Sequence, residues 1–282
     1  RYVNRKLKRL TSDIGDLKKH TESNEFGLYA IDIRTPSDRY AAKLLTDALG
    51  ASRIRDFAKA LSFVSKARSL SPNWHEVYRI SAFIKATSGD LLGSEEDYET
   101  GLSIEPKDPR LLFYFAQFLL FELEDVDKAQ NHLNVLQGVR PGHLYTTLLE
   151  SRIEHKKKNN AKALSLILSH LELPHTVQDE RIIYTDALSI LGDIIRFELR
   201  YTKDTLKAMA AFDQLASYFG KCVSKSIADA RLIKNFSESL YLVVGSIQEH
   251  EIQNSRERVL ELFNSFKPIL QSSSMFEKLE NR

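Results

Sequence analysis

The sequence predicts an all-α protein built as a solenoid of helix-turn-helix repeats. Prolines lie at Pro72, Pro106, Pro141 and Pro174, with separations of 34, 35 and 33 residues. A fixed period of this size is typical of a stacked array in which each unit buries its apolar face against its neighbours. Only 11 glycines and 7 prolines occur among 282 residues, which favours long helices over turn-rich β structure. Apolar residues recur at helical spacing within each period.

The charges are unevenly distributed along the chain. The formal net charge is +2, yet residues 1–70 carry 15 Lys/Arg against 8 Asp/Glu, and residues 76–127 carry 4 against 12. The single cysteine, Cys222, excludes an intrachain disulfide and is interpreted as a small apolar residue on a helix. The longest apolar run is far shorter than the roughly 20 residues that a membrane span needs. We therefore expect no membrane association and a cytoplasmic location.

Residues 1–35 are interpreted as a basic N-terminal helix and linker. Leu7, Leu10, Ile14 and Leu17 recur at helical spacing beneath a cluster of Arg and Lys, which predicts an amphipathic helix with a basic outer face over residues 1–20. Residues 25–34 have the aromatic and β-branched content of a short extended segment.

Four repeats are predicted over residues 36–175. The first repeat opens with a predicted capping box: Thr35 caps the helix, and the Asp38 carboxylate can bond back to the backbone of the capping residue. Pro36 takes the first helical position. One face of this helix is expected to carry Tyr40, Leu44, Leu45, Ala48 and Leu49. The next helices are predicted at residues 56–70, 74–88 and 92–104, and the third and fourth repeats follow the same pattern up to Pro141 and Pro174.

Beyond residue 175 the period fails but the helical pattern continues. Thr176 and Asp179 form a second capping signal. Helices are predicted at residues 182–199, 205–219, 226–248 and 255–270. Residues 176–282 are interpreted as a helical extension that caps the array, because the last repeat would otherwise expose its apolar flank to water. A separate ligand-binding bundle is the alternative.

The units resemble tetratricopeptide repeats (TPR), in which small residues let two antiparallel helices approach closely and a proline ends the second helix. The residues that carry the resemblance are Ala48, Ala60, Ala67, Pro72, Ala82, Ser94, Tyr98, Gly101, Pro106, Ala116, Ala129, Pro141, Ser151, Ala163 and Pro174. The resemblance covers about half of the chain and implies a right-handed α-solenoid whose first helices line the concave face. The usual first-helix residues are mostly replaced, so the half-repeats of RNA-processing proteins remain an alternative.

The same resemblance implies a scaffold or sensor module that binds a protein or peptide in its concave groove. The implied groove residues are Arg53, Arg79, Phe83, Phe113, Gln117, Phe121, Tyr145, Arg152, His155 and Lys156. Arg79 and Phe83 stand where chaperone-tail-binding members carry a Lys and Asn clamp, which argues against that role. More loosely, the chain is similar to the C-terminal sensor regions of bacterial STAND-type NTPases and related antiviral defence proteins, whose catalytic domain lies upstream.

The chain carries no Gly-rich phosphate loop, Cys-x-x-Cys pair or His-Glu-x-x-His motif, so we expect no enzyme activity, cofactor or metal site. His170 and His175 come nearest to a metal-ligand spacing. The alternative function is RNA binding through the basic arm and the edge at residues 152–158. The candidate nucleic-acid contacts are Arg5, Lys6, Lys8, Arg9, Lys157 and Lys158. The sequence does not identify the partner or the oligomeric state.

Overall fold

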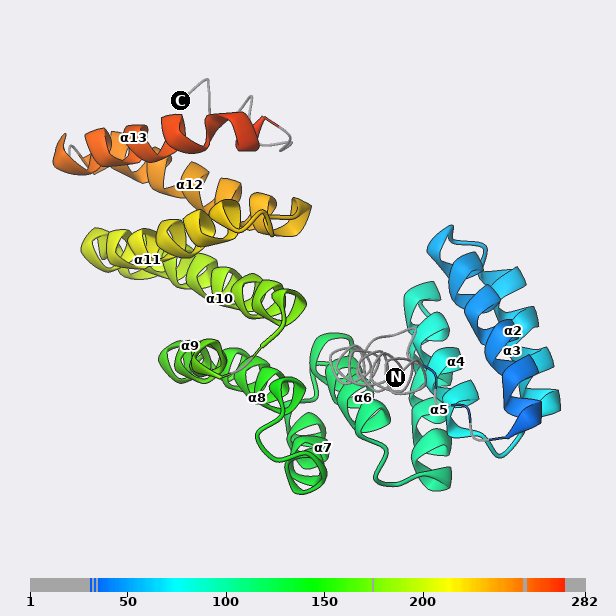
Figure 1. The fold of residues 1–282 in the computed structure, drawn as a ribbon. Helices are drawn as coiled ribbons and strands as arrows, with labels where there is room; N and C mark the ends of the chain where they lie inside the picture. The colour runs from blue at the N-terminus through cyan, green and yellow to red at the C-terminus, as the bar shows by residue number, and fades with distance from the viewer. Residues whose placement is uncertain (1–30, 32, 34, 174, 251–252, 272–282) are drawn as a thin grey trace, which may run out of the picture. The chain divides into compact units, whose positions relative to one another are not determined.

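The computed structural model describes residues 31, 33, 35–173, 175–250 and 253–271, and all regular structure within them is helical (Figure 1). The chain divides into two compact units, Arg1–Lys157 and Lys158–Arg282. The predicted helix at residues 1–20 and nearly all of the predicted extended segment at 25–34 lie outside the described residues. The division falls between the two helices of the predicted fourth repeat, so the boundaries of a four-repeat array remain a prediction.

The first unit is a stack of antiparallel helix pairs (Figure 1). Its helices are α2 Pro36–Arg53, α3 Phe57–Leu70, α4 His75–Ser88, α5 Leu91–Ile104, α6 Pro109–Phe121, α7 Val126–Val139 and α8 Leu144–Lys156. Helix α2 packs on α3, α4 on α5, and α6 on α7. The first helices also contact one another in series, α2 with α4, α4 with α6, and α6 with α8. This arrangement confirms the prediction of an all-α repeat solenoid.

Polar side chains cap the helices of the first unit, except α4, which follows Trp74 without a side-chain cap. The predicted capping box is confirmed, because the Thr35 side chain accepts from the Asp38 backbone N–H while the Asp38 carboxylate accepts from the Thr35 backbone N–H at 2.8 Å. An aspartate directly precedes the second helix of each pair. Its carboxylate accepts a hydrogen bond from the backbone N–H of the residue three positions further along the chain. These aspartates are Asp56, Asp90 and Asp125.

Small residues at the repeat-specific positions are buried, as predicted. Ala48, Ala60, Ala67, Ala82, Ser94, Ala116 and Ala129 are each 0% exposed. At Gly101 a Cβ would lie 3.0 Å from Cδ2 of Leu111 and 3.4 Å from Cβ of Tyr78, so the close approach of α5 to its neighbours requires a residue of this size.

The expectation that Tyr40 lies on the buried face of α2 was wrong. Its side chain is 74% exposed, and the next residue, Ala41, is 0% exposed and enters the core instead. Leu45, Ala48 and Leu49 of the same expected face are buried, so the helical phase was right and Tyr40 lies beyond the edge of the buried face.

The second unit is a bundle of longer helices (Figure 1). Its elements are α9 Asn160–Ser169, a 3₁₀ turn His170–Glu172, α10 Val177–Phe197, a π-helical turn Glu198–Thr202, α11 Thr205–Ser224, α12 Ala230–His250 and α13 Gln253–Leu270. Helix α10 contacts α9, α11 and α12, and α12 contacts α13. The predicted capping box of Thr176 and Asp179 is present at the start of α10. The assignment of these helices as a cap remains a prediction.

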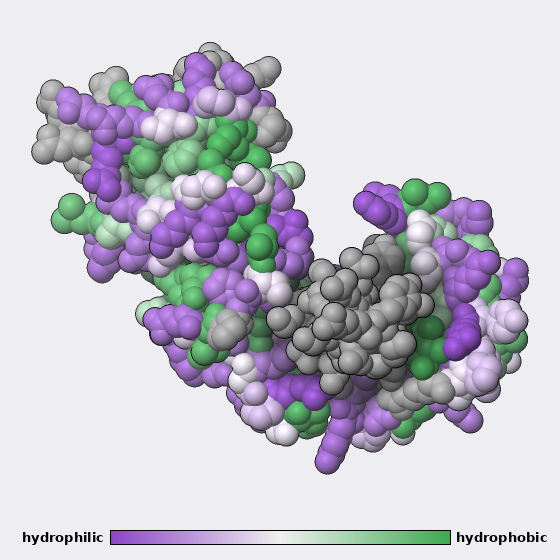
Figure 2. All heavy atoms as spheres, in the orientation of Figure 1, coloured by the Kyte–Doolittle hydropathy of each residue, from purple (hydrophilic) through white to green (hydrophobic). Residues whose placement is uncertain are grey.

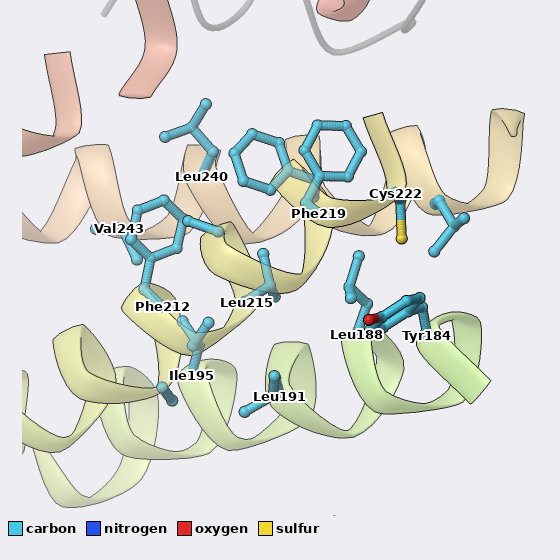
Figure 3. Packing of buried hydrophobic residues seen from close by; sticks show 14 of the residues in the cluster. Tyr184, Leu188, Leu191, Ile195, Phe212, Leu215, Phe219, Cys222, Leu240 and Val243 are labelled. Atoms are coloured by element: carbon cyan, nitrogen blue, oxygen red, sulfur yellow. The ribbon is translucent and has the colours of Figure 1, made fainter. Parts of the chain in front are cut away.

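The core of the second unit combines aliphatic side chains with a group of stacked aromatic rings (Figure 3). The rings of Phe219 and Phe236 stack with centroids 4.2 Å apart, and the Phe266 ring meets both edge-on. Cys222 is 0% exposed in the same core, as predicted. Burial, together with the nearby Glu180 carboxylate, raises the pKa of its thiol to about 12, so the thiol is protonated at neutral pH and the structure gives it no nucleophilic role.

Exposed hydrophobic side chains are scattered over both units, and the visible face shows hydrophobic residues interspersed with hydrophilic ones (Figure 2). Examples are Ile54, Leu92 and Leu206, which are 76%, 78% and 80% exposed. Isolated residues of this kind are normal on a protein surface. Among the described helices, none has a stretch long and apolar enough to cross a bilayer.

Candidate partner-binding groove

A buried ionic cluster joins α4 to α6 in the first unit. Glu76 is 0% exposed, and its Oε2 lies 2.7 Å from Nε and from Nη2 of Arg79 one turn later on α4. Its Oε1 lies 2.5 Å from Nη2 of Arg110 on α6. Because one carboxylate serves two arginines on neighbouring first helices, the cluster fixes the relative position of those helices.

Asp108 adds a second carboxylate to this cluster. Its Oδ1 accepts the backbone N–H groups of Arg110 and Leu111 at the start of α6, and its Oδ2 lies 3.3 Å from Nε2 of His75. Burial alone would raise the pKa of this carboxyl. The contact with His75, the Arg110 charge and the Leu111 N–H together hold the pKa of Asp108 well below its ordinary value.

A depressed pKa makes the stability of the first unit dependent on pH. The contribution of the Asp108 carboxylate is fully present above the unfolded-state pKa near 4 and is lost as the pH falls towards the folded-state pKa. We expect Asp108→Asn to lower the free energy of unfolding at pH 7 by about 2 kcal/mol and to lose less stability than wild type between pH 4 and pH 2. Urea titrations followed by fluorescence of Trp74, the only tryptophan, measure both effects.

The matched control for this experiment is Asp127→Asn. Asp108 is the N-cap of α6, and Asp127 is likewise an aspartate at the start of a helix, in the first turn of α7, but it is exposed. The control variant should therefore differ from wild type by less than about 0.5 kcal/mol at every pH. Parallel pH profiles for wild type and Asp108→Asn would contradict the assignment.

An aromatic pocket of about 450 Å³ lies beside the cluster, where the C-terminal halves of α4 and α6 face each other over α5. It is lined by Phe83, Ala86, Thr87, Tyr98, Tyr114, Gln117, Phe118, Phe121 and Glu122. Burial raises the pKa of Tyr114 to about 12, against the opposing charge of Arg79, whose guanidinium lies 5.4 Å from the Tyr114 ring. The Tyr114 hydroxyl is therefore neutral at physiological pH.

Three of the groove residues expected from the sequence, Phe83, Gln117 and Phe121, meet in the aromatic pocket. Phe121 is 47% exposed at its edge, and Nζ of Lys156 lies 5.5 Å from its ring. Two further groove residues pair nearby, because the Phe113 and Tyr145 rings meet edge-on with centroids 5.1 Å apart. The structure thus places three of the expected groove residues in the aromatic pocket and a further two in contact with each other.

The remaining expected residues lie in different surroundings. Arg53 is exposed in the last turn of α2, and Arg152 and His155 are half-buried on α8. Arg79 is 0% exposed and Phe113 is 2% exposed, so the contact of either residue with a partner remains a prediction.

The candidate nucleic-acid contacts are only partly described. Lys157 and Lys158 are exposed, and Nζ of Lys157 donates to Oε1 of Gln130 at 2.8 Å. The other candidates, Arg5, Lys6, Lys8 and Arg9, lie outside the described residues. A role for either group in nucleic-acid contact remains a prediction.

Sequence reasoning missed the residues that connect the repeats. Glu76 and Arg110 occupy equivalent positions one repeat period apart. Glu95 on α5 and Lys128 on α7, whose side chains lie 2.9 Å apart, are not at equivalent positions, because they follow the capping residues Asp90 and Asp125 by different distances. A search for opposite charges separated by one period would have found the first pair. The pocket residues Tyr114 and Glu122 were also missed, because nothing local in the sequence shows that their side chains converge with those of another helix.

Within the described part of the chain, no group of three or more His, Cys, Asp or Glu side chains is placed to hold a metal ion. His170 is buried in the 3₁₀ turn after α9, whereas the His175 ring nitrogen contacts the Leu173 carbonyl at 2.7 Å in an exposed loop.

The described residues therefore define an all-α helical-repeat protein of the tetratricopeptide-like fold class. The chain is similar in structure to Pseudomonas aeruginosa pilF, with a TM-score of 0.56 and 14% identity over 88% of this chain and 99% of that chain. It is also similar to PilW, described as a widely conserved type IV pilus biogenesis factor, with a TM-score of 0.58 and 14% identity over 85% and 97%. No family model and no curated protein matches the sequence. At this level of identity the likeness shows the fold alone.

Proposed function

We propose that this chain is a protein-interaction scaffold whose first unit binds a peptide or protein segment in the groove formed by α4 and α6. The observation that carries the proposal is the aromatic pocket, which places several rings, one amide and one carboxylate around a single concavity. Aromatic side chains offer large contact areas at low cost in side-chain entropy, and pockets of this kind anchor the residues that dominate binding energy.

Two wider expectations rest on resemblance or composition alone and remain predictions. One is a sensor role in a STAND-type NTPase or an antiviral defence protein, and the other is a cytoplasmic location. RNA binding through residues 152–158 is less favoured, because Lys156 and Lys157 already contact Glu124 and Gln130 of the same unit at 3.6 and 2.8 Å.

The proposal is tested by replacing two rings of the aromatic pocket, those of half-buried Phe83 and exposed Phe121, and measuring partner binding. Phe83→Ala/Phe121→Ala removes two rings from the aromatic pocket without touching the buried ionic cluster. Affinity capture from a native lysate, with nuclease and at two salt concentrations, should recover a stoichiometric protein with wild type. We expect the double variant to bind that protein at least about thirtyfold more weakly in a subsequent titration, since two aromatic anchors are lost.

Leu92→Ala is the matched control, because Leu92 is a large, exposed apolar residue of the same unit that does not line the aromatic pocket. It should bind the partner as wild type does. Equal binding by the double variant would refute the groove assignment. Recovery of a nucleic acid that is lost at higher salt would instead assign the function to the basic arm.

A further inference from the structure

The aromatic pocket has the chemistry to hold a cationic side chain with a long apolar stem. Its walls are aromatic rings, and Glu122 contributes a carboxylate to the lining. Ammonium groups are attracted to the faces of such rings, and the arrangement already occurs at the edge of this pocket, where Nζ of Lys156 lies 5.5 Å from the Phe121 ring. A partner rich in Lys, Arg and aliphatic residues therefore suits this site.

The part of the same unit that forms the aromatic pocket, residues 76–127, is also acidic, with 4 Lys/Arg against 12 Asp/Glu. Between residues 76 and 127 the buried carboxylates of Glu76, Asp97 and Asp108 are each paired with an arginine or a lysine. Among the described residues, no cation lies within 4.0 Å of several exposed carboxylates of the unit. These are Glu96, Glu99, Glu122 and Asp127. Residues 76–127 consequently carry an excess of negative charge, including the exposed Glu122 carboxylate that lines the aromatic pocket.

The sequence supplies one segment with complementary chemistry. Residues 1–20, which lie outside the described residues, carry seven Lys/Arg against two Asp/Glu and place Leu7, Leu10, Ile14 and Leu17 at helical spacing. Residues 21–34 connect them to the start of α2. An extended connection of this length spans roughly 45–50 Å, whereas neighbouring packed helices lie about 8–10 Å apart, so the segment can reach α4 and α6.

We propose that residues 1–20 bind intramolecularly in the groove of the first unit, with a basic side chain in the aromatic pocket, and that they compete there with the partner. This inference rests on the groove of the proposed function. Tethering through a short linker gives an effective concentration in the millimolar range, so a weak contact is enough to keep the groove occupied. A partner would bind by displacing the segment.

Hydrogen–deuterium exchange of the full chain tests the inference, because peptic peptides from residues 1–20 report directly on the segment. In wild type, their amides should exchange at least about tenfold more slowly than those of a free synthetic peptide of the same sequence. Protection should be the same at protein concentrations that differ by about tenfold, since the contact is intramolecular. It should fall near 1 M salt, where the screening length is about 3 Å.

Two variants locate the contact. Phe83→Ala/Phe121→Ala should return residues 1–20 to the exchange rate of the free peptide, and Glu122→Lys should reduce their protection by reversing one exposed charge. Leu92→Ala should keep the wild-type protection. Exchange of these residues at the free-peptide rate in wild type, or full protection in both pocket variants, would overturn the inference. Protection that rises with protein concentration would overturn it as well.

The exchange result and the partner titration separate the two proposals. Unprotected residues 1–20, combined with partner binding that is lost in the double variant, would reject only the intramolecular contact. Protection that depends on the aromatic pocket, combined with partner binding that the double variant retains, would reject only the assignment of the groove to the partner.

Discussion

Replacing Glu76 by Gln is expected to lower the free energy of unfolding of the first unit by about 3–5 kcal/mol. The Glu76 carboxylate is fully buried and lies within 2.7 Å of both Arg79 and Arg110. The substitution preserves the shape of the side chain but removes the negative charge that compensates two buried guanidinium groups. Urea denaturation followed by Trp74 fluorescence measures the loss, because Trp74 is buried directly before α4.

Glu96→Gln is the control for this prediction, since it makes the same chemical change at an exposed residue of α5 and should alter stability by less than about 0.5 kcal/mol. A double variant strengthens the test. Glu76→Gln/Arg79→Met should be more stable than the sum of the two single effects predicts, because it removes one of the charges left uncompensated. A loss below about 1 kcal/mol for Glu76→Gln would show that the cluster does not hold the first helices together.

Truncating Phe236 to Ala should destabilise the second unit by about 3–5 kcal/mol. Phe236 is 0% exposed, and its ring contacts those of Phe212, Phe219 and Phe266. The deletion opens a cavity among rigid aromatic rings from α11 and α13, which cannot collapse to fill it. Exchange rates of α10 and α11 amides in the intact chain measure the loss, since those helices share the aromatic core.

Phe197→Ala is the control for the second unit, because Phe197 is 50% exposed at the end of α10 and lies outside the aromatic core. It should leave the exchange of α11 amides close to wild type. If Phe236→Ala did the same, the aromatic stack would not be the principal source of stability in this unit.

The sequence was informative where interactions are local. Capping boxes at Thr35 and Thr176 depend on residues three positions apart, and the structure contains both. The small residues of the repeats were equally predictable, because close helix packing demands them at a fixed spacing. Ala60 and Ala129, for example, are fully buried. The edge of a buried helix face was harder to predict, because Tyr40 is exposed although Leu45 and Leu49 of the same expected face are buried.

Long-range convergence was not predictable from one sequence. The charged residues Glu76 and Arg110 resemble ordinary surface residues in their local context, yet both are buried because they meet across two first helices. The aromatic pocket has the same origin. Phe83 and Phe121 were chosen by repeat position, but Tyr98 and Tyr114 complete the pocket from two different helices.

The polar contacts between successive helix pairs also differ in which pair supplies the cation and which supplies the anion. Between the first two helix pairs, Arg68 supplies the cation and Asp97 the anion. Between the next two the polarity is reversed, because Glu76 precedes Arg110 and Glu95 precedes Lys128. Moving the first helix pair elsewhere in the array would separate Arg68 from Asp97 and leave that buried carboxylate with Lys85 as its cation. The first helix pair is therefore matched by charge to the second, and the two are not freely interchangeable with other pairs.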